Sequence, residues 1–321
     1  MTTWEIAATV LLALLVAGGL FAGWLLVKRP LEVFAWGARR SLRRAGLKKI
    51  VVRAPAGSQT AFVGGSGPVL VLLHGAGDQA GTWFHVAPSL ARRYTLVIPD
   101  LAGHGDSAPS VGPIPFSDVL GGLEAVISDQ AAGGRVTLVG NSLGAWMAMV
   151  FAARHPERVE RVVAVNGGPL VGSGGGPNLL PKTREEARET MARLRDAGSP
   201  AIPDRVLDDV VRRSATSPIA RLAAAAAGMA PFLLGEDQLR AFEVPVRLVW
   251  GVSDGLMPLD YARRMAAVLP DVALIPVERC GHVPQQEAAE RFLSALEKAL
   301  GDAPALPQSP ATGPHPKGHP I

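Results

Sequence analysis

Six short apolar runs recur along this chain of 321 residues, and most of the stretches between them have the spacing of helices. Each run is four or five residues long and rich in aliphatic side chains, as buried strands are. The runs occupy residues 69–73, 95–98, 136–139, 162–165, 246–249 and 272–275, and helices are predicted at residues such as 143–154 and 286–300. Strands that alternate with helices predict an α/β fold, with a mostly parallel sheet covered on both faces.

The alternation stops between about residues 167 and 240, where no convincing strand is found. Thr183 and Glu186 have the spacing of a capping box for a helix that runs through Arg195. We therefore predict a helical cap inserted over the sheet. The α/β domain is expected to span residues 50–301, and the proline-rich residues 302–321 are expected to form a disordered tail.

Residues 6–27 contain no charged side chain. As a helix, 22 residues span roughly 33 Å, which is close to the thickness of a bilayer's hydrocarbon core. Trp4 and Trp24 stand near the two ends, where indoles favour the membrane interface. Glu5 before the run and Lys28 after it do not suit a cleaved signal peptide. The pattern predicts a transmembrane helix, so residues 1–49 are expected to form an anchor with a basic juxtamembrane segment.

Residues 28–49 hold eight basic side chains and one acidic one, a net charge of +7. Such a cluster stays on the cytoplasmic side of a single span, which predicts that the large domain lies in the cytoplasm. Residues 31–47 suit either a helix lying on anionic lipid or a solvated linker. The body beyond residue 49 has a net charge of −2, so a nucleic-acid partner is not expected. Cys280 is the single cysteine of the chain, which excludes an intramolecular disulfide and a site of several thiolates.

A Gly-Asn-Ser-Leu-Gly motif at residues 140–144 connects a predicted strand to a predicted helix. A serine at such a sharp turn is strained and exposes its hydroxyl group, so Ser142 is a candidate nucleophile. Its base would be His282, on a loop after the last predicted strand. The orienting acid would be Asp254, which follows the run at 246–249. The end of the predicted strand at 162–165 is another place for the acid, but the residue there is Asn166, whose side chain is an amide.

An oxyanion formed during acyl transfer needs hydrogen-bond donors. The Leu143 amide, at the start of a helix, is one candidate. The other is the Ala76 amide, in the His-Gly-Ala-Gly turn at 74–77 after the first predicted strand. His74 and His104 are expected to shape their own loops, and Cys280 is expected to be a packed thiol. Trp83 and Trp146 are candidates for the acyl pocket, although core packing explains them at least as well.

These motifs resemble those of the α/β-hydrolases, in the order of that family, over roughly residues 50–300. The resemblance rests on residues 74–77, 103–107, 140–144, the Asp254 loop and Gly281-His282. Many members of the family have a second glycine after the serine turn, where this chain has Ala145. The dehalogenases and epoxide hydrolases of this fold use aspartate as the nucleophile, so Ser142 counts against those two activities. The anchor and residues 180–186 are similar to those of membrane-anchored monoacylglycerol lipases, and carbon–carbon-bond hydrolases share the Gly-Asn-Ser turn.

The resemblance implies a serine hydrolase that cleaves carboxylic esters without a metal or organic cofactor. A lipid-like substrate, such as a monoacylglycerol taken from the bilayer, is the expected ester. Three alternatives stay open from the sequence: a carbon–carbon-bond hydrolase of ring-cleavage products, an acyltransferase, and a non-catalytic ligand receptor on the same fold.

Overall fold

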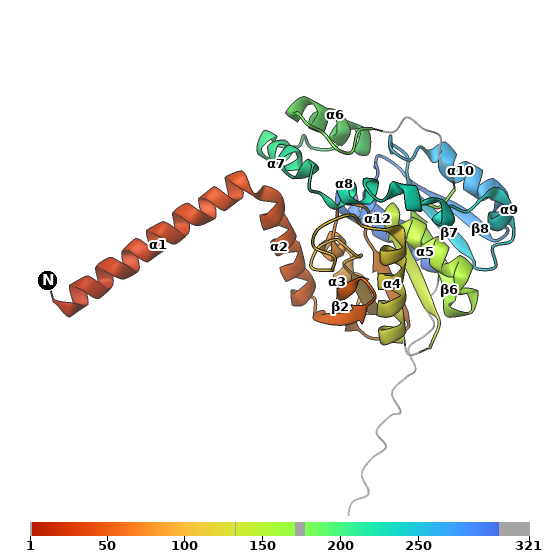
Figure 1. Ribbon diagram of the computed structural model, residues 1–321, viewed down its shortest axis with the longest axis horizontal. Helices are drawn as coiled ribbons and strands as arrows, with labels where there is room; N and C mark the ends of the chain where they lie inside the picture. The colour runs from red at the N-terminus through yellow and green to blue at the C-terminus, as the bar shows by residue number, and fades with distance from the viewer. Residues whose placement is uncertain (1, 132, 171–176, 302–321) are drawn as a thin grey trace, which may run out of the picture.

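An eight-stranded sheet forms the centre of the computed structural model, which describes residues 2–131, 133–170 and 177–301 (Figure 1). The strand order is β1-β2-β4-β3-β5-β6-β7-β8. The strands are β1 (Lys48–Ala54), β2 (Gly57–Gly65), β3 (Val69–Leu73), β4 (Thr95–Pro99), β5 (Val136–Asn141), β6 (Val159–Val165), β7 (Val246–Gly251) and β8 (Val272–Val277). β3 to β8 run parallel, and β1 and β2 add an antiparallel hairpin beside β4. The predicted α/β class is confirmed, and each of the six apolar runs lies in a strand.

Helices cover both faces of the sheet and bury two separate apolar clusters. One face packs against α4 (Phe116–Ala131), α5 (Leu143–Arg154) and α10 (Leu259–Val268). The other packs against α2 (Pro30–Arg44), the 3-10 turn η1 (Ala80–Trp83), α3 (Ala87–Leu90) and α12 (Ala289–Leu300). The predicted C-terminal helix is broken at Ala288, where the short α11 (Pro284–Glu287) ends and α12 begins.

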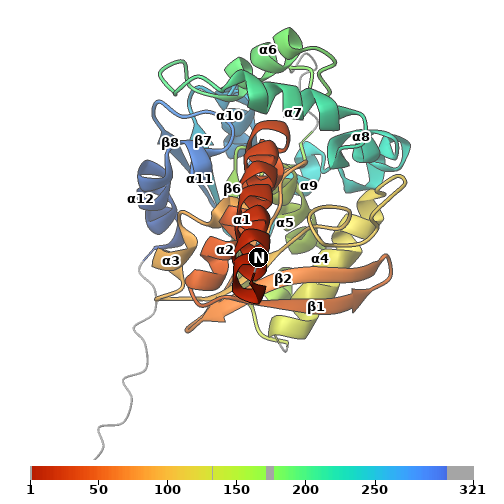
Figure 2. The same cartoon turned by 90° about the vertical axis from the view of Figure 1, so that its left-hand side faces the viewer.

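A block of short helices separates β6 from β7, in the interval where the cap is predicted (Figure 2). It consists of α6 (Arg184–Leu194), α7 (Asp204–Ser214), α8 (Pro218–Ala223), η3 (Ala226–Gly228), η4 (Ala230–Phe232) and α9 (Glu236–Arg240). No strand occurs in the part of this interval that the structure describes. Thr183 caps α6 by accepting the Glu186 amide at 3.1 Å. The cap connects the two strands that precede Asn166 and Asp254.

The first helix, α1 (Thr3–Lys28), projects away from the body and has no buried residue (Figure 1). Its most apolar window has a mean hydropathy of 2.5. Among the described residues it is the one helix that is by itself long and apolar enough to cross a membrane, a property that signal sequences share. α1 is therefore a candidate transmembrane helix. The tail predicted at 302–321 lies outside the described residues.

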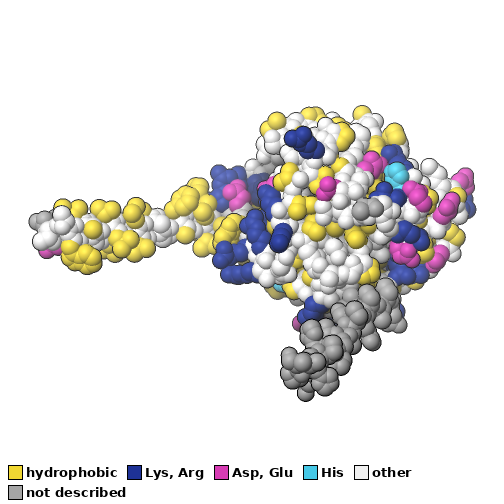
Figure 3. Space-filling view, turned by 90° about the horizontal axis from the view of Figure 1, so that it is seen from below, with side chains coloured by type: hydrophobic (Ala, Val, Ile, Leu, Met, Phe, Trp, Pro, Cys, Tyr) yellow, Lys and Arg dark blue, Asp and Glu magenta, His cyan; other side chains and the backbone are white. Residues whose placement is uncertain are grey.

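The basic segment after α1 is a docked helix rather than a solvated linker. Arg29 alone separates α1 from α2, and α2 buries Ala38 and Leu42 against the body. Basic side chains gather where the apolar α1 meets the body (Figure 3). The exposed side chains of α2 include Phe34 and Trp36 as well as arginines. This face combines the apolar and cationic groups of a helix that lies at a membrane surface.

Candidate active site

Ser142 occupies the sharp turn between β5 and α5. Its backbone has φ 53° and ψ −115°, a conformation that strains residues with a side chain. Gly140 and Gly144 make the turn possible, because an added Cβ would lie 2.2 Å from the Gly144 carbonyl carbon or 2.4 Å from the Leu73 oxygen, respectively. Ser142 is half-buried. The strained turn therefore places a serine at the carboxyl edge of the central strands, as the sequence motif predicts.

Asp254 and His282 are buried and in direct contact. His282 Nδ1 lies 2.7 Å from Asp254 Oδ2, and the other carboxylate oxygen accepts the amides of Leu256 and Met257 at 2.8 and 2.9 Å. A carboxylate held in this way fixes the imidazole tautomer and leaves Nε2 for proton transfer. Among the described residues no hydrogen bond joins His282 to Ser142. The distance between a serine and its base often shortens only when substrate binds.

Asn141, the residue before Ser142, connects the nucleophile turn to the base loop. Its Nδ2 donates to the His282 carbonyl at 2.9 Å and to the Val165 carbonyl at 3.2 Å. Its Oδ1 accepts from Gln285 Nε2 at 3.2 Å. Residues 141 positions apart in the chain are therefore held side by side. This contact brings the backbone of His282 next to the turn that carries Ser142.

Asn166, at the end of β6, orients the acid rather than replacing it. Its Nδ2 donates to Asp254 Oδ2 at 2.7 Å, and its Oδ1 accepts the Gly251 amide at 3.1 Å. Its φ of 48° is the left-handed conformation that asparagine tolerates better than most residues. The position is visible in the sequence as a possible site for the acid, but its role as a donor to Asp254 is not.

The turn after β3 passes directly over Ser142. A Cβ on Gly75 would lie 3.2 Å from the Ser142 Cβ, so the turn needs glycine to approach this closely. The Ala76 amide, which follows, donates to no described backbone or side-chain group. The Leu143 amide stands at the first residue of α5, where helical amides have no intrahelical acceptor. Both amides are thus placed on elements next to the serine, and their oxyanion role remains a proposal.

The other candidate bases and nucleophiles are buried in forms that suit a structural role. Burial lowers the pKa of His74 to about 4 and the pKa of His104 to about 3, so both rings are neutral at pH 7. His74 Nε2 accepts the Leu101 amide at 2.9 Å. Burial raises the pKa of the Cys280 thiol to about 12, which opposes a thiolate. The described residues include no cluster of three or more His, Cys, Asp or Glu side chains suited to a metal ion.

The two tryptophans proposed for the acyl pocket occupy packed positions. Trp83 is fully buried and packs against Phe292, with ring centroids 6.1 Å apart, so it belongs to the core rather than to a substrate pocket. Trp146 is half-buried beneath the cap. Its indole donates to the Phe232 carbonyl and its ring lies 4.8 Å from that of Phe116. Trp146 therefore helps to seat the cap on α5.

The end of α6 holds the loops that carry Asp254 and His282 through backbone hydrogen bonds. The Leu194 carbonyl accepts the His282 amide at 2.8 Å, and the Arg193 carbonyl accepts the Gly255 amide at 2.9 Å. Glu287 of α11 accepts the amides of Asp196 and Gly281, each at 2.7 Å. The cap is thus connected to the acid and base loops, and this connection has no sequence signal.

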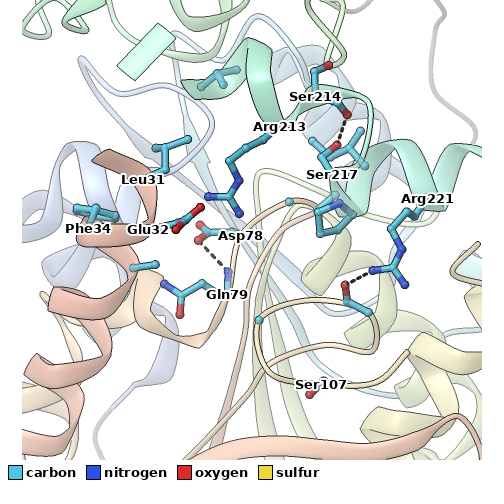
Figure 4. A pocket seen from close by; sticks show the side chains of 18 of the residues that line it. Leu31, Glu32, Phe34, Asp78, Gln79, Ser107, Arg213, Ser214, Ser217 and Arg221 are labelled. Carbon is cyan, nitrogen blue, oxygen red and sulfur yellow. Dashed lines mark hydrogen bonds between the residues drawn. The ribbon is translucent and has the colours of Figure 1, made fainter. Parts of the chain in front are cut away.

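A cleft of about 1030 Å³ opens between α2, the turn at 75–79 and the cap helices α6 to α8 (Figure 4). Its lining includes Ala76 and also Val283, the residue after His282. Ser142 is not part of the lining, so the cleft adjoins the serine through the neighbouring turn and loop. Leu31, Phe34 and Trp36 line it from α2, which places the juxtamembrane helix beside the approach to the site.

Comparisons with known proteins show what the chain is similar to. A model of the "Alpha/beta hydrolase family" matches residues 70–295. An uncharacterised protein of Mycobacterium tuberculosis is 29% identical over 287 residues, which cover 81% of this chain and 84% of that protein. A 2-hydroxy-6-oxononadienedioate/2-hydroxy-6-oxononatrienedioate hydrolase of Cupriavidus pinatubonensis is 28% identical, covering 74% of this chain and 89% of its own length. The crystal structure of a bacterial membrane phospholipase A superposes with a TM-score of 0.71 at 25% identity, over 91% of this chain and 98% of that one.

Proposed function

Because the chain belongs to the alpha/beta hydrolase family, we propose that it is a membrane-anchored serine hydrolase that cleaves carboxylic esters through an acyl-enzyme on Ser142. The observation that carries this proposal is the 2.7 Å contact between Asp254 and His282, whose loop is tied by Asn141 to the strained serine turn. This is the set of groups that acyl transfer requires: a nucleophile, a base and an oriented acid.

In the proposed reaction, Ser142 attacks the ester carbonyl while His282 Nε2 takes the hydroxyl proton. Asp254 stabilises the imidazolium that forms, and the amides of Ala76 and Leu143 bind the oxyanion. His282 then gives its proton to the departing alcohol, which leaves an acyl group on Ser142. In the second half, His282 removes a proton from water, and the hydroxide adds to the acyl carbon. The bond from that carbon to Ser142 Oγ then breaks, His282 returns its proton to Oγ, and the carboxylic acid leaves.

Lipid-like esters are the substrates that the structure favours. The cleft beside the site is walled by α2, and α2 directly follows the candidate transmembrane helix. A single-pass anchor with the hydrolase domain on the cytoplasmic side would keep this cleft at the bilayer surface. The likeness to a membrane phospholipase A supports an acyl lipid, and a monoacylglycerol is the simplest such substrate.

A carbon–carbon-bond hydrolase is the second candidate function, because the Cupriavidus relative carries that activity in its name. The same serine, base and acid would then act on a vinylogous diketone. The candidate transmembrane helix is the observation that favours the ester proposal over this one, since a small soluble diacid has no need of a bilayer.

Labelling by a fluorophosphonate probe tests the proposed chemistry on the full-length protein in detergent. The wild type should be labelled and Ser142→Ala should not, and a panel of esters should show faster turnover of monoacylglycerols than of short soluble esters. Turnover of ring-fission diketones with no ester hydrolysis would favour the second candidate. Absence of labelling in the wild type would reject both. Reporter fusions after residue 60 should report the cytoplasm, and a signal outside it would overturn the topology.

A further inference from the structure

Two arginines of the cap line the cleft without a carboxylate partner among the described residues: Arg213 of α7 and Arg221 of α8. Arg221 is fixed by backbone carbonyls, donating to Gly112 and Pro109 at 2.6 Å and to Gly103 at 3.0 Å. These carbonyls engage three of its five N–H donors and leave its positive charge without a counter-ion among the described residues. Arg221 therefore contributes a fixed positive potential to the wall of the cleft.

Arg213 differs from Arg221 because its guanidinium forms no hydrogen bond or ion pair with any residue that the structure describes. It is half-buried and reaches from α7 into the cleft, toward Asp78 and Glu32 (Figure 4). Five donors in a planar fork thus face the cavity unused. A guanidinium in this position is suited to bind an anion that enters from solution or from a lipid.

The carboxylates nearest to Arg213 have other partners. Glu32 lies 3.5 Å from both Arg29 and Arg212. Asp78 accepts from Gln286 Nε2 at 3.0 Å and from the Gln79 amide at 2.8 Å. Burial raises the pKa of Asp78 to about 6, which still leaves its carboxylate mostly ionised at pH 7. These contacts leave Arg213 as the cation of the cap wall that is open to a ligand. On the opposite wall, Arg43 of α2 also lacks an ion pair among the described residues, and its guanidinium lies 5.9 Å from the Phe62 ring centroid.

We propose that Arg213 binds an anionic group of the substrate, a phosphate or a carboxylate, and so selects acyl esters that carry one. This rests on the proposed ester hydrolase and names its substrate class. The acyl carbonyl would lie at Ser142, beyond the turn at Ala76, while the anionic end of the alcohol would lie against α7. Recognition would be bidentate, as it is at many guanidinium sites for phosphate and carboxylate.

The first test measures binding alone, so it does not depend on catalysis. Full-length protein in detergent micelles is titrated with two non-hydrolysable ethers, 1-O-alkylglycerol 3-phosphate and 1-O-alkylglycerol. The wild type should prefer the phosphate, and Arg213→Gln should lose that preference by about 10- to 100-fold while keeping its affinity for the neutral ether. Arg213→Lys keeps the positive charge but not the planar guanidinium, so its preference for the phosphate should lie between that of the wild type and that of Arg213→Gln. Arg205→Gln is the matched control, because Arg205 is exposed on the same helix and does not line the cleft.

The second test uses turnover and separates the two sources of the anion. An acylglycerol 3-phosphate supplies a phosphate, the acyl ester of 4-hydroxybutanoate supplies a carboxylate, and the uncharged acylglycerol is the reference. Arg213→Gln should lower kcat/KM for one or both charged esters and leave the reference and the fluorophosphonate labelling unchanged. Equal losses on charged and neutral esters, or no loss of phosphate binding, would overturn the proposal. Wild-type protein that binds the phosphate through Arg213 but hydrolyses no ester would reject the proposed function and keep the anion site.

Discussion

Asn166 and His282 approach the same oxygen of Asp254, and each lies 2.7 Å from it. The amide donates from the end of β6 and the imidazole from the loop after β8. Two donors on one oxygen hold the carboxylate in a single orientation. Asn166 therefore positions the carboxylate that we propose as the catalytic acid.

Removal of the Asn166 side chain should lower catalysis more than stability. Asn166→Gly keeps the left-handed backbone and loses the donor to Asp254, so kcat should fall by about 10-fold, the worth of one hydrogen bond to a charged group. Asn166→Ala loses the same donor and adds about 1 kcal/mol of backbone strain, so it should also lower Tm. Steady-state kinetics and thermal unfolding separate the two effects. Unchanged kcat in the glycine variant would mean that Asp254 is oriented without Asn166.

Acidification should destabilise the protein through His74 and His104. Their pKa values in the folded chain, about 4 and about 3, lie below the ordinary 6.5, so the unfolded chain binds more protons as the pH falls. The stability that the neutral rings provide is complete above pH 6.5 and is lost toward pH 4 and 3. Asp78, with a pKa raised to about 6, has the opposite sign and offsets part of the loss.

We expect the free energy of unfolding to fall by on the order of 4 kcal/mol between pH 7 and pH 4, since a pKa displaced by one is worth about 1.4 kcal/mol. Tm should fall by about 10 °C over the same interval. His104→Gln, which cannot be protonated, should remove most of this dependence, because the His104 ring alone accounts for about 3 kcal/mol of the loss before the Asp78 offset. Parallel Tm curves for the variant and the wild type would show that His104 does not titrate in the folded chain as expected.

Glu287 should act on the base through the backbone of its loop. Its carboxylate accepts the amides of Gly281 and Asp196 and the Ser199 hydroxyl, so it joins the base loop to the end of α6. Glu287→Gln places an amide NH₂ against one of these donors, and the rate of fluorophosphonate labelling should fall by about 10-fold. Glu290→Gln, an exposed neighbour, should leave the rate unchanged. A loss of Tm with no change in labelling rate would indicate that Glu287 only stabilises the fold.

The two sides of α2 should respond differently to substitution. Leu42 is fully buried against the sheet, so Leu42→Ala should cost about 2–5 kcal/mol of unfolding free energy. Trp36 is 62% exposed, so Trp36→Ala should leave Tm unchanged and weaken binding to vesicles that contain anionic lipid. A form that begins at residue 29 is the suitable protein for the vesicle assay, because α1 buries no residue. Equal vesicle binding by Trp36→Ala and its parent would show that the exposed side of α2 does not bind the membrane through Trp36.

The sequence is sufficient to predict the parallel sheet and the places of the serine, acid and base, because each depends on a local pattern at a strand end. The antiparallel hairpin is different. β1 carries three basic residues, and β2 contains three glycines with few aliphatic side chains, so neither has the apolar run of a buried strand. Their pairing is set by register with each other and with β4, which no local pattern encodes.

Long-range contacts explain what else the sequence leaves hidden. Asn166 meets Asp254 across 88 residues, and Glu287 meets Asp196 across 91. Such contacts depend on how distant segments of the chain pack together, and the sequence next to each residue does not predict them. Trp83 illustrates the reverse case, because a large aromatic residue near the oxyanion turn suits a pocket and a core equally until its exposure is known.

In the proposed membrane-anchored arrangement, the single residue between α1 and α2 would limit how the hydrolase domain sits above a bilayer. With so short a hinge, and with α2 docked on the body, the domain would not swing freely, and the opening of the cleft would keep one orientation toward the headgroups. A lipid would need only to rise partway from its leaflet, with its tail still solvated by its neighbours. Lengthening that hinge with flexible residues would then slow turnover of bilayer lipids while sparing the same lipids in micelles.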